Sequence, residues 1–589
     1  MSFNATDTVN YSKNFTFGME DYTILGLMLA ISTAIGIYFG FFSVRNNTAD
    51  EYLLGGKRMT IWPIAISLIA SQLSGISVIA IPAEMYSFGF TYVFISSSMI
   101  FVVPILCYFV LPVFYENNIS NCYEYLELRF NKKTRKIVTF AYILTTFLYL
   151  PVYIFIPSLA FSQVTGNNVH IVNGIVCFVC VMYTMLGGIK AVVWTDVIQG
   201  GIMVGSIILI GVIGTLKAGG VSKVIDNAID GGRLQVNIDL DPRVRATVWN
   251  CFFGGFCLWI GSIGLNQTCV QRIVALPSVV FARRSLVIAG IGFFVIMTFN
   301  CLTGIIMYAL YYNCDPLKLK IVDKSDKLMP YFVQDVAGHL TGMPGVFISC
   351  VFSAALSTIS ANLNSLSGIF YFDCVKPFIK HHTEQKANFV MKAFVFFSGI
   401  YCISGGFIVE QFNSILQTVL TIGGLTQGSI VGVFFLGLLV PKAHGKAALV
   451  GLVSSMMGVL CIFIGAQIRI KAGELSYAPL PTRTDGCLNN ITLNTSIFKD
   501  NFREESFPKD IGFNMFDISF YWYKFIGVVL VWIIAVPLSY LTPERKAVNV
   551  NLLSPFVKNI MKRKQRSTTA ASSSLTEEHE LELPNGLIR

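Results

Sequence analysis

Apolar runs long enough to cross a lipid bilayer recur along the chain, separated by polar segments. A membrane-spanning helix needs about 20 apolar residues, because the hydrocarbon core is about 30 Å thick and a helix rises about 1.5 Å per residue. The runs predict transmembrane helices over residues 22–44, 61–88, 91–115, 137–163, 169–186, 191–216, 248–270, 285–312, 345–372, 389–409, 412–440, 447–468 and 520–541. The pattern therefore predicts an all-α polytopic membrane protein with about thirteen transmembrane helices.

The charges of the connecting segments predict the side of the membrane on which each lies. Five basic residues fall between positions 129 and 136, after the third run, and such residues are enriched in cytoplasmic loops. Sequons for N-glycosylation, which need an external position, are Asn4, Asn10, Asn14, Asn490 and Asn494. We therefore expect residues 1–21, 217–247 and the glycosylated loop within 447–541 to be extracellular. The 542–589 tail should be cytoplasmic, in a protein of the plasma membrane.

Composition narrows the class further. Hydrophobic residues make up 54% and charged residues 13% of the 589 residues, whereas a soluble domain is about 25% charged. The net charge of +10 follows from basic cytoplasmic segments and gives no reason to expect nucleic acid. Cys177 and Cys180 lie in an apolar run, which disfavours a redox or zinc site. Cys314 and Cys487 fall in predicted external segments, where a disulfide is possible.

Polar residues interrupt two of the predicted spans. The stretch 67–89 reads SLIASQLSGISVIAIPAEMYSFG, and the stretch 251–272 contains four glycines followed by an Asn-Gln pair. Interrupted helices at matching positions of two halves are typical of transporters built from inverted repeats. Without the peripheral helix 22–44, the segments 61–216 and 248–440 form two units of five spans, each opening with an interrupted helix. The alternative is that each interruption is only a polar kink packed against a neighbour.

A stripe of small polar residues follows one face of the predicted span 345–372. Ser353, Ser357, Ser360 and Asn364 are three or four residues apart and therefore share a helix face. Polar side chains are costly in lipid unless they face the bundle interior or a water-filled path. Hydroxyl oxygens suit a cation such as Na⁺. The alternative is that they bond their own helix or join it to a neighbour.

Several stretches in order resemble the sodium/solute symporter family, the glucose, iodide, monocarboxylate and multivitamin group. They are SLIASQLSGIS with IPAEMYSFG, YEYLELRF, GGIKAVVWTDVIQ, LNQTCVQR, FSAALSTISANLNS and GGLTQGSIVGVFFLG. The resemblance covers residues 22–541, and PAEMYSFG and LNQTCVQR are more similar to the monocarboxylate, multivitamin and iodide branch than to the sugar branch. It implies the leucine-transporter-type fold with a 5+5 inverted repeat.

The resemblance also implies a sodium site where the first interrupted helix meets the polar stripe. Carbonyl oxygens would come from Ala70, Leu73 and Ala354, and hydroxyl oxygens from Ser357 and Thr358. Asp196 matches an acidic residue on the inward sodium path, although it could instead cap a helix. Ser353, Asp196 and Gln199 are possible contributors to a second sodium site.

The solute is expected between the two interrupted helices. The candidate residues are Gln72, Ser74, Gly75, Ser77, Tyr149, Gln199, Trp259 and Gln267. Ser262 and Ile263 stand where family members often carry an aromatic gate, so either another helix supplies the gate or the solute differs. Lys and Arg are not expected within the spans near the interrupted helices. An anion would then depend on helix N-termini and amides.

These features together predict a symporter that couples a small organic anion, a monocarboxylate or a carboxylated vitamin, to Na⁺ by alternating access. Alternative solutes are iodide-like inorganic anions, sugars or polyols, and choline. A channel or a sensor of the same fold is a further alternative. The six His residues form no catalytic cluster in the sequence, so we expect no enzyme and no cofactor. The expected partners are Na⁺, the solute and the lipid bilayer, and the oligomeric state stays open.

Overall fold

The computed structural model describes residues 17–42, 59–119, 121–378, 383–411, 415–487, 514–542 and 548–563. These residues form helices and connecting loops, and no strand is assigned among them. The predicted glycosylation sites Asn4, Asn10, Asn14, Asn490 and Asn494 lie outside the described residues, as does most of the predicted cytoplasmic tail.

The membrane-length helices follow the predicted runs closely. They are α1 (Met19–Ile37), α3 (Ile61–Gln72) with α4 (Gly75–Phe88), α5 to α7 (Val93–Ser97, Met99–Ile105 and Leu111–Glu116), α9 (Lys132–Thr165), α10 (Val169–Lys217), α12 (Val248–Trp259) with α13 (Gln267–Val274), α14 (Val279–Leu310), α16 (Met343–Ile369), α17 (Glu384–Val409), α18 (Ile415–Leu439), α19 (Gly445–Lys471) and α20 (Tyr523–Leu541). Shorter helices are α8 (Glu124–Arg129), α11 (Val221–Asp230) and α15 (Leu328–Ala337).

The number of spans agrees with the prediction. Eleven helices of the described residues are long and apolar enough to cross a membrane, and two bent pairs raise the number to thirteen. α10 provides two of these spans, because Gly188 interrupts it with φ 57° and ψ −154°. A positive φ of this kind is readily adopted only by glycine. The predicted boundary between the spans 169–186 and 191–216 is therefore a glycine kink.

Two helices break where the sequence predicts. α3 and α4 meet at a bend of 55°, and the segment 248–264 meets α13 at a bend of 51°. After the first break, the Ser74 hydroxyl accepts a hydrogen bond from the backbone of Ser77 at 3.4 Å. After the second, Asn266 Oδ1 accepts one from the backbone of Thr268 at 2.9 Å. Both residues are good N-caps, so each begins a new helix inside a span.

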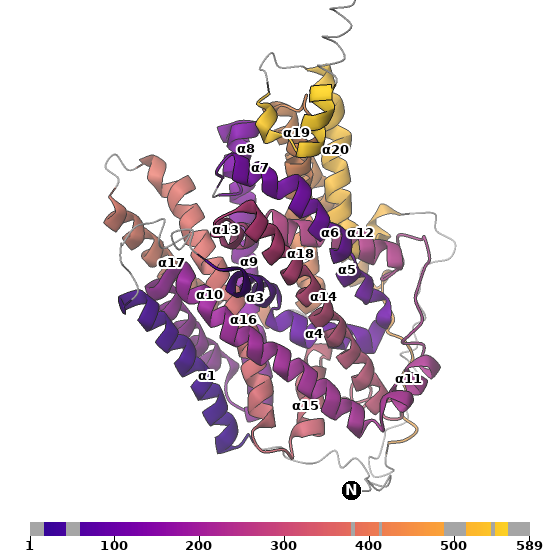
Figure 1. Cartoon of the computed structure of the whole chain (residues 1–589). Coiled ribbons are helices and arrows are strands. Elements are labelled where there is room, and N and C mark those ends of the chain that lie inside the picture. The colour runs from indigo at the N-terminus through magenta and orange to yellow at the C-terminus, as the bar shows by residue number, and fades with distance from the viewer. Residues whose placement is uncertain are drawn as a thin grey trace, which may run out of the picture.

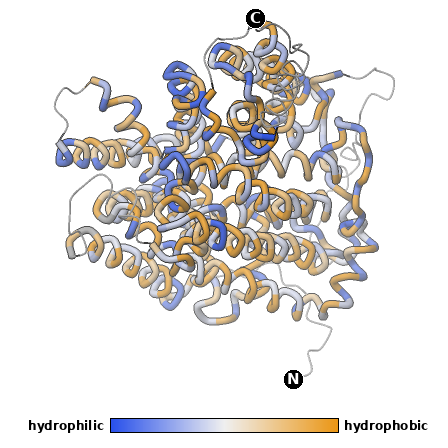
Figure 2. The backbone as a smooth tube through the Cα atoms, turned by 45° about the horizontal axis from the view of Figure 1, so that its top comes forward, coloured by the Kyte–Doolittle hydropathy of each residue, from blue (hydrophilic) through white to orange (hydrophobic). Residues whose placement is uncertain are grey.

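The helix α16 lies at the centre of the bundle. It packs against α10, α9, α3 and α4, and almost all of its residues are buried. The helix α1 lies at the edge of the bundle beside α10 and α16, whereas α19 and α20 lie together beside α18 (Figure 1). Hydrophobic residues run along the helices, and hydrophilic residues gather at their ends and in loops (Figure 2).

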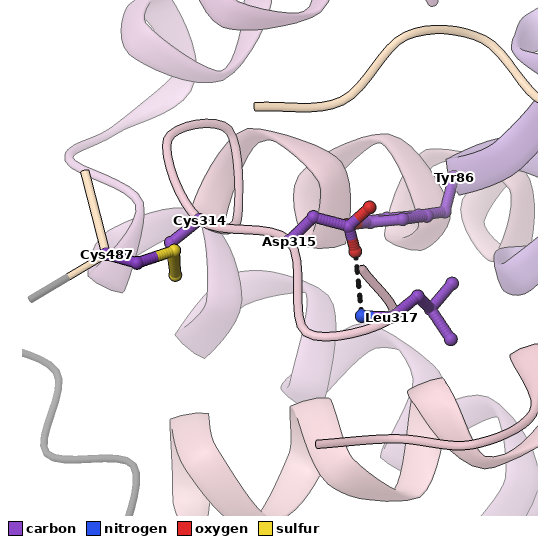
Figure 3. Close-up of a disulfide and its surroundings, with 5 residues drawn as sticks. All are labelled: Tyr86, Cys314, Asp315, Leu317 and Cys487. Atoms are coloured by element: carbon purple, nitrogen blue, oxygen red, sulfur yellow. Dashed lines mark hydrogen bonds between the residues drawn. A yellow bond between two sulfur atoms is a disulfide. The ribbon is translucent and has the colours of Figure 1, made fainter. Parts of the chain in front are cut away.

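We call the face that carries α11 and α15 the outer face, and the face that carries α8 the inner face, after the sides predicted for these segments. A disulfide between Cys314 and Cys487 lies on the outer face (Figure 3). Beside it, the Tyr86 hydroxyl donates to Asp315 Oδ1 at 2.8 Å. Asp241 is also on this face, and hydrogen bonds from Arg243 lower the pKa of Asp241. The disulfide that the sequence left open is therefore present and joins two outer segments.

Candidate functional site

The polar stripe of α16 faces the break between α3 and α4. Thr358 Oγ1 lies 3.4 Å from the Ser71 carbonyl oxygen and 2.9 Å from the Ala354 carbonyl oxygen. Ala70, Leu73 and Ala354 are fully buried, and so is Ser357. Because α3 ends at Gln72, its last carbonyl groups have no partner within the helix. The five residues predicted for the sodium site therefore belong to segments that contact one another.

The hydroxyls of the stripe differ in their hydrogen bonds. Ser360 donates to the Ser357 carbonyl at 3.1 Å, as expected of a serine that bonds its own helix. Ser353 and Ser357 are completely buried; the Ser353 hydroxyl has no hydrogen-bond partner within the described chain, and the Ser357 hydroxyl has none within its own helix and lies near the Asp196 carboxylate. A buried polar group without a partner is costly and rare. A hydrogen bond within its own helix therefore explains Ser360, but it does not explain Ser353 or Ser357.

Asp196 lies inside α10 with no exposed surface, so its alternative role as an interfacial helix cap is wrong. Its Oδ2 accepts hydrogen bonds from the Ser67 hydroxyl at 2.6 Å and from Arg272 Nη2 at 2.9 Å. The Ser357 hydroxyl is close enough to interact with this carboxylate. Oδ1 nevertheless has no partner of normal length among the described residues. One carboxylate oxygen thus remains available beside the stripe.

Arg272 corrects the expectation that no Arg or Lys lies within the spans near the interrupted helices. It follows the predicted span 248–270 and was expected in an inner loop, but only 1% of it is exposed. The bend before α13 carries it into the bundle, where it forms an ion pair with Asp196. Its Nε and Nη1 have no partners within the described chain.

A cavity of about 160 Å³ opens between the two broken helices. It is lined by residues of α3, α9, α13, α16, α18, α20 and the segment 258–266, among them Ser71, Gln72, Tyr142, Tyr149, Ser262, Asn266, Thr358, Asn362, Gln427 and Lys524. An engineered cavity of about 150 Å³ can hold benzene. The space therefore suits a small organic molecule, and Thr358 of the predicted sodium site forms part of its wall.

The cavity includes two of the predicted solute residues, Gln72 and Tyr149. Gln72 Nε2 donates to the Ser262 carbonyl at 3.3 Å, which joins the two broken helices. Tyr149 donates to the Val419 carbonyl at 2.8 Å. Both side chains therefore lie where a solute would contact them.

The other predicted solute residues do not line the cavity. Trp259 donates to the Ile95 carbonyl at 2.9 Å, and Gln267 accepts from the Cys122 backbone at 2.8 Å. Gln199 donates to the Ser32 hydroxyl of α1 at 3.1 Å. Their polar groups thus hold the bundle together.

At the first break, the hydroxyls of Ser74 and Ser77 lie 3.4 Å apart and restart the helix. A Cβ placed on Gly75 would contact Ile156, Pro157 and Val351 at 3.7 Å. Ser74, Gly75 and Ser77 therefore shape the break without lining the cavity.

Sequence reasoning missed several cavity residues. Ser262, where the resemblance led us to expect an aromatic gate, accepts a hydrogen bond from Gln427 Nε2 of α18 at 2.9 Å. Aromatic rings of α9 line the cavity instead, including Tyr142 and Tyr149. Lys524 of α20 is 5% exposed and also reaches the cavity, which again corrects the expectation of no cationic residue there. The sequence indicates its burial, because Lys524 lies four residues after the start of the apolar run 520–541.

The fold and this site are typical of polytopic transporters with paired broken helices. Comparisons with known proteins indicate the same class. The model of the sodium:solute symporter family matches residues 52–455. The chain is 36% identical over 555 residues to sodium-coupled monocarboxylate transporter 1 of Homo sapiens, covering 90% of this chain and 88% of that protein. It is 32% identical over 533 residues to the sodium-dependent multivitamin transporter of Oryctolagus cuniculus, covering 90% of this chain and 83% of that protein.

A solved structure, a substrate-bound outward-open state of a Na⁺-coupled sialic acid symporter, has a TM-score of 0.73 and 24% identity to the chain. The match covers 90% of this chain and 100% of that one, and it shows the shared fold. The chain belongs to the sodium:solute symporter family. It is therefore a member of a transporter family and not an enzyme.

Proposed function

We propose that the protein is a plasma-membrane symporter that couples a small monocarboxylate to Na⁺ by alternating access. The observation that carries the proposal is the meeting of α16 with the broken helix α3–α4 beside a cavity lined by amides, hydroxyls and aromatic rings. Broken helices supply backbone carbonyls for a cation and helix N-termini for an anionic solute near the bilayer midplane. The family match and the names of the relatives support the same function.

The proposed sodium site uses the carbonyl oxygens of Ala70, Leu73 and Ala354 and the hydroxyl oxygens of Ser357 and Thr358. Its support is the buried hydroxyl of Ser357, which makes no hydrogen bond within its own helix, and the close approach of Thr358 to the end of α3. Sodium is a hard cation that prefers oxygen ligands, and bound Na⁺ would satisfy oxygens that the fold leaves unpaired.

Asp196 would lie on the path by which Na⁺ leaves toward the inner face. Its free Oδ1 and the nearby Ser357 hydroxyl support this role. Ser353, whose hydroxyl is also buried without a partner in the described chain, is a candidate for a second sodium site. Gln199 is a further candidate, because its Nε2 donates to Ser32 and its buried Oε1 has no partner within the described chain.

The size of the cavity supports a small monocarboxylate over a larger carboxylated vitamin. A volume of about 160 Å³ is close to the space that benzene fills in an engineered cavity of about 150 Å³. The amides of Gln72 and Gln427 and the hydroxyls of Ser71, Thr145 and Thr426 provide polar contacts around it. Lactate, pyruvate and nicotinate are molecules of this size and charge.

Coupling to sodium supplies enough free energy for accumulation. Moving one charge through 100 mV is worth about 2.3 kcal/mol, and a tenfold sodium gradient adds about 1.4 kcal/mol. A monoanion that moves with a single Na⁺ carries no net charge and gains no electrical drive. An inward current during uptake would therefore show that more than one Na⁺ moves with each anion.

The test is uptake under voltage clamp with lactate, pyruvate, nicotinate, biotin, iodide, glucose, inositol and choline, with and without Na⁺. We expect Na⁺-dependent accumulation of the small monocarboxylates and little uptake of glucose, inositol or choline. Accumulation of iodide alone would contradict an organic substrate. Steady current without accumulation would instead favour a channel.

The predicted orientation has a separate test. Glycosidase treatment of intact cells should reduce the apparent mass if Asn4, Asn10, Asn14, Asn490 or Asn494 carries external glycans. An antibody against an added C-terminal tag should label the protein only after permeabilisation. Labelling of intact cells would contradict a cytoplasmic tail.

A further inference from the structure

Lys524 is a charged side chain in the wall of the cavity. It lies near the start of α20, is 5% exposed, and lines the cavity together with Gln72, Tyr149 and Gln427. Among the described residues that line this cavity, Lys524 alone carries a formal charge. The cavity therefore carries one positive charge, and its other polar groups are amides and hydroxyls.

The ammonium group of Lys524 has few hydrogen-bond partners among the described residues. Its Nζ donates to the Leu420 carbonyl at 3.4 Å, a long hydrogen bond for a group with three donors. No ion pair joins Lys524 to an acidic side chain anywhere in the described chain. A buried cation without a counter-charge is costly, and buried lysines are almost always paired. An anion that enters the cavity would supply the counter-charge that the described chain does not.

Packing around Lys524 keeps its ammonium group beside the solute space. A Cβ placed on Gly423 would overlap the Tyr149 hydroxyl and lie 3.3 Å from Lys524 Nζ. The glycine of α18 therefore lets the tyrosine hydroxyl and the lysine ammonium approach the same point from two helices. The Tyr149 hydroxyl donates its one hydrogen bond to the Val419 carbonyl, whereas the ammonium of Lys524 keeps donors for a carboxylate that enters the cavity.

We propose that Lys524 forms the ion pair with the solute's carboxylate and that it selects anions over neutral molecules of the same shape. This inference rests on the proposed function, because it assigns the recognition of its anionic substrate to one residue. Removal of one partner from a charged hydrogen bond is expected to cost on the order of tenfold or more in affinity.

The experiment compares uptake of nicotinate with that of nicotinamide, which has nearly the same shape and no charge. In the wild type we expect Na⁺-dependent uptake of nicotinate and little of nicotinamide. Lys524→Met removes the charge with small change of volume, and it should raise the KM for nicotinate on the order of tenfold or more and reduce the preference over nicotinamide. Lys524→Arg keeps the charge and should retain the preference.

Lys217→Met is the matched control. Lys217 ends α10 on the outer face and pairs with Asp335, so its substitution removes the same charge far from the cavity. Surface labelling corrects each uptake rate for the amount of protein at the cell surface. An unchanged KM and preference in surface-expressed Lys524→Met would overturn the role of Lys524 and leave the proposed function intact. A wild type that accumulates only a neutral solute would overturn both.

A second measurement does not depend on folding of a variant. In wild-type membranes, an amine-reactive reagent should modify Lys524, and mass spectrometry of the peptide can quantify the modification. Nicotinate with Na⁺ should protect Lys524, and nicotinamide should not. Equal modification with and without nicotinate, in protein that transports it, would contradict the ion pair.

Discussion

Two buried ion pairs lie at opposite ends of the broken helices, and they differ in how completely they are satisfied. Toward the outer face, Glu84 of α4 accepts two hydrogen bonds from Arg245, at 3.1 and 2.9 Å, and one from Tyr521 at 3.1 Å. The Arg245 guanidinium also lies 3.9 Å from the centre of the Phe88 ring. This pair has the bidentate geometry of a strong structural contact.

Toward the inner face, the pair between Asp196 and Arg272 has a single hydrogen bond at 2.9 Å. Asp196 Oδ1 and two nitrogens of Arg272 have no partners within the described chain, although both side chains are at most 2% exposed. A pair this deeply buried and incompletely bonded gains less than its desolvation costs. We infer that the outer pair stabilises the fold and that the inner pair belongs to the ion path.

The largest expected effect comes from breaking the inner pair. Asp196→Asn leaves the Arg272 charge buried without compensation, so we expect a loss of about 3–5 kcal/mol of stability and very little uptake. Thermal unfolding of detergent-solubilised protein and surface labelling measure the loss of stability. Na⁺-dependent uptake measures the loss of transport.

The matched control for that variant replaces both partners, as Asp196→Leu with Arg272→Met. Exchange of a buried ion pair for apolar side chains is often neutral or stabilising. We expect recovery of thermal stability and surface expression, with uptake still impaired. Full recovery of Na⁺-dependent uptake would show that the inner pair is only structural.

The second effect concerns the outer disulfide. The loop that carries Cys487 also carries Tyr477, whose ring lies 5.4 Å from the Arg245 guanidinium. Replacement of both Cys314 and Cys487 by Ser should cost about 2–4 kcal/mol of stability. The half-saturating Na⁺ concentration should stay the same, because the proposed sodium site is formed by α3 and α16 and not by the segments that the disulfide joins. A shift in that concentration would mean that the two faces are coupled.

The smallest effect is expected from Glu84→Gln. The amide oxygen can still accept hydrogen bonds from Arg245 Nε and Tyr521, but the amide NH₂ cannot accept the bond from Arg245 Nη2. The Phe88 ring still covers the guanidinium. We expect a loss of about 1.5–3 kcal/mol of stability, as for a hydrogen bond to a charged group. Thermal unfolding checks the loss, and sodium titration of uptake should match the wild type. A raised half-saturating Na⁺ concentration in Glu84→Gln would contradict the assignment of the outer pair to the fold.

Most of the fold could be predicted from the sequence because membrane insertion depends on local composition. The thirteen predicted spans depend only on apolar runs, and the breaks at Ser74 and Asn266 depend on local capping residues. The polar stripe was also local, since Ser353, Ser357 and Ser360 repeat at helical spacing. These features need no knowledge of distant contacts.

The site was predicted in part, because its remaining residues depend on contacts between distant segments. Trp259 bonds to Ile95, and Gln267 bonds to Cys122, and neither partner can be found from local pattern. Arg272 follows an apolar run in the sequence, and only the bend before α13 buries it.

The central claim is that Na⁺ binds where α16 meets the broken helix, and the sodium dependence of uptake tests it most directly. Ser357→Ala and Thr358→Ala should each raise the half-saturating Na⁺ concentration on the order of tenfold. Ser367→Ala is the control, because Ser367 lies on the same helix, is equally buried and donates to the Asn364 carbonyl at 2.7 Å. We predict a large shift in both site variants and none in the control. Wild-type sodium dependence in both Ser357→Ala and Thr358→Ala would contradict the account.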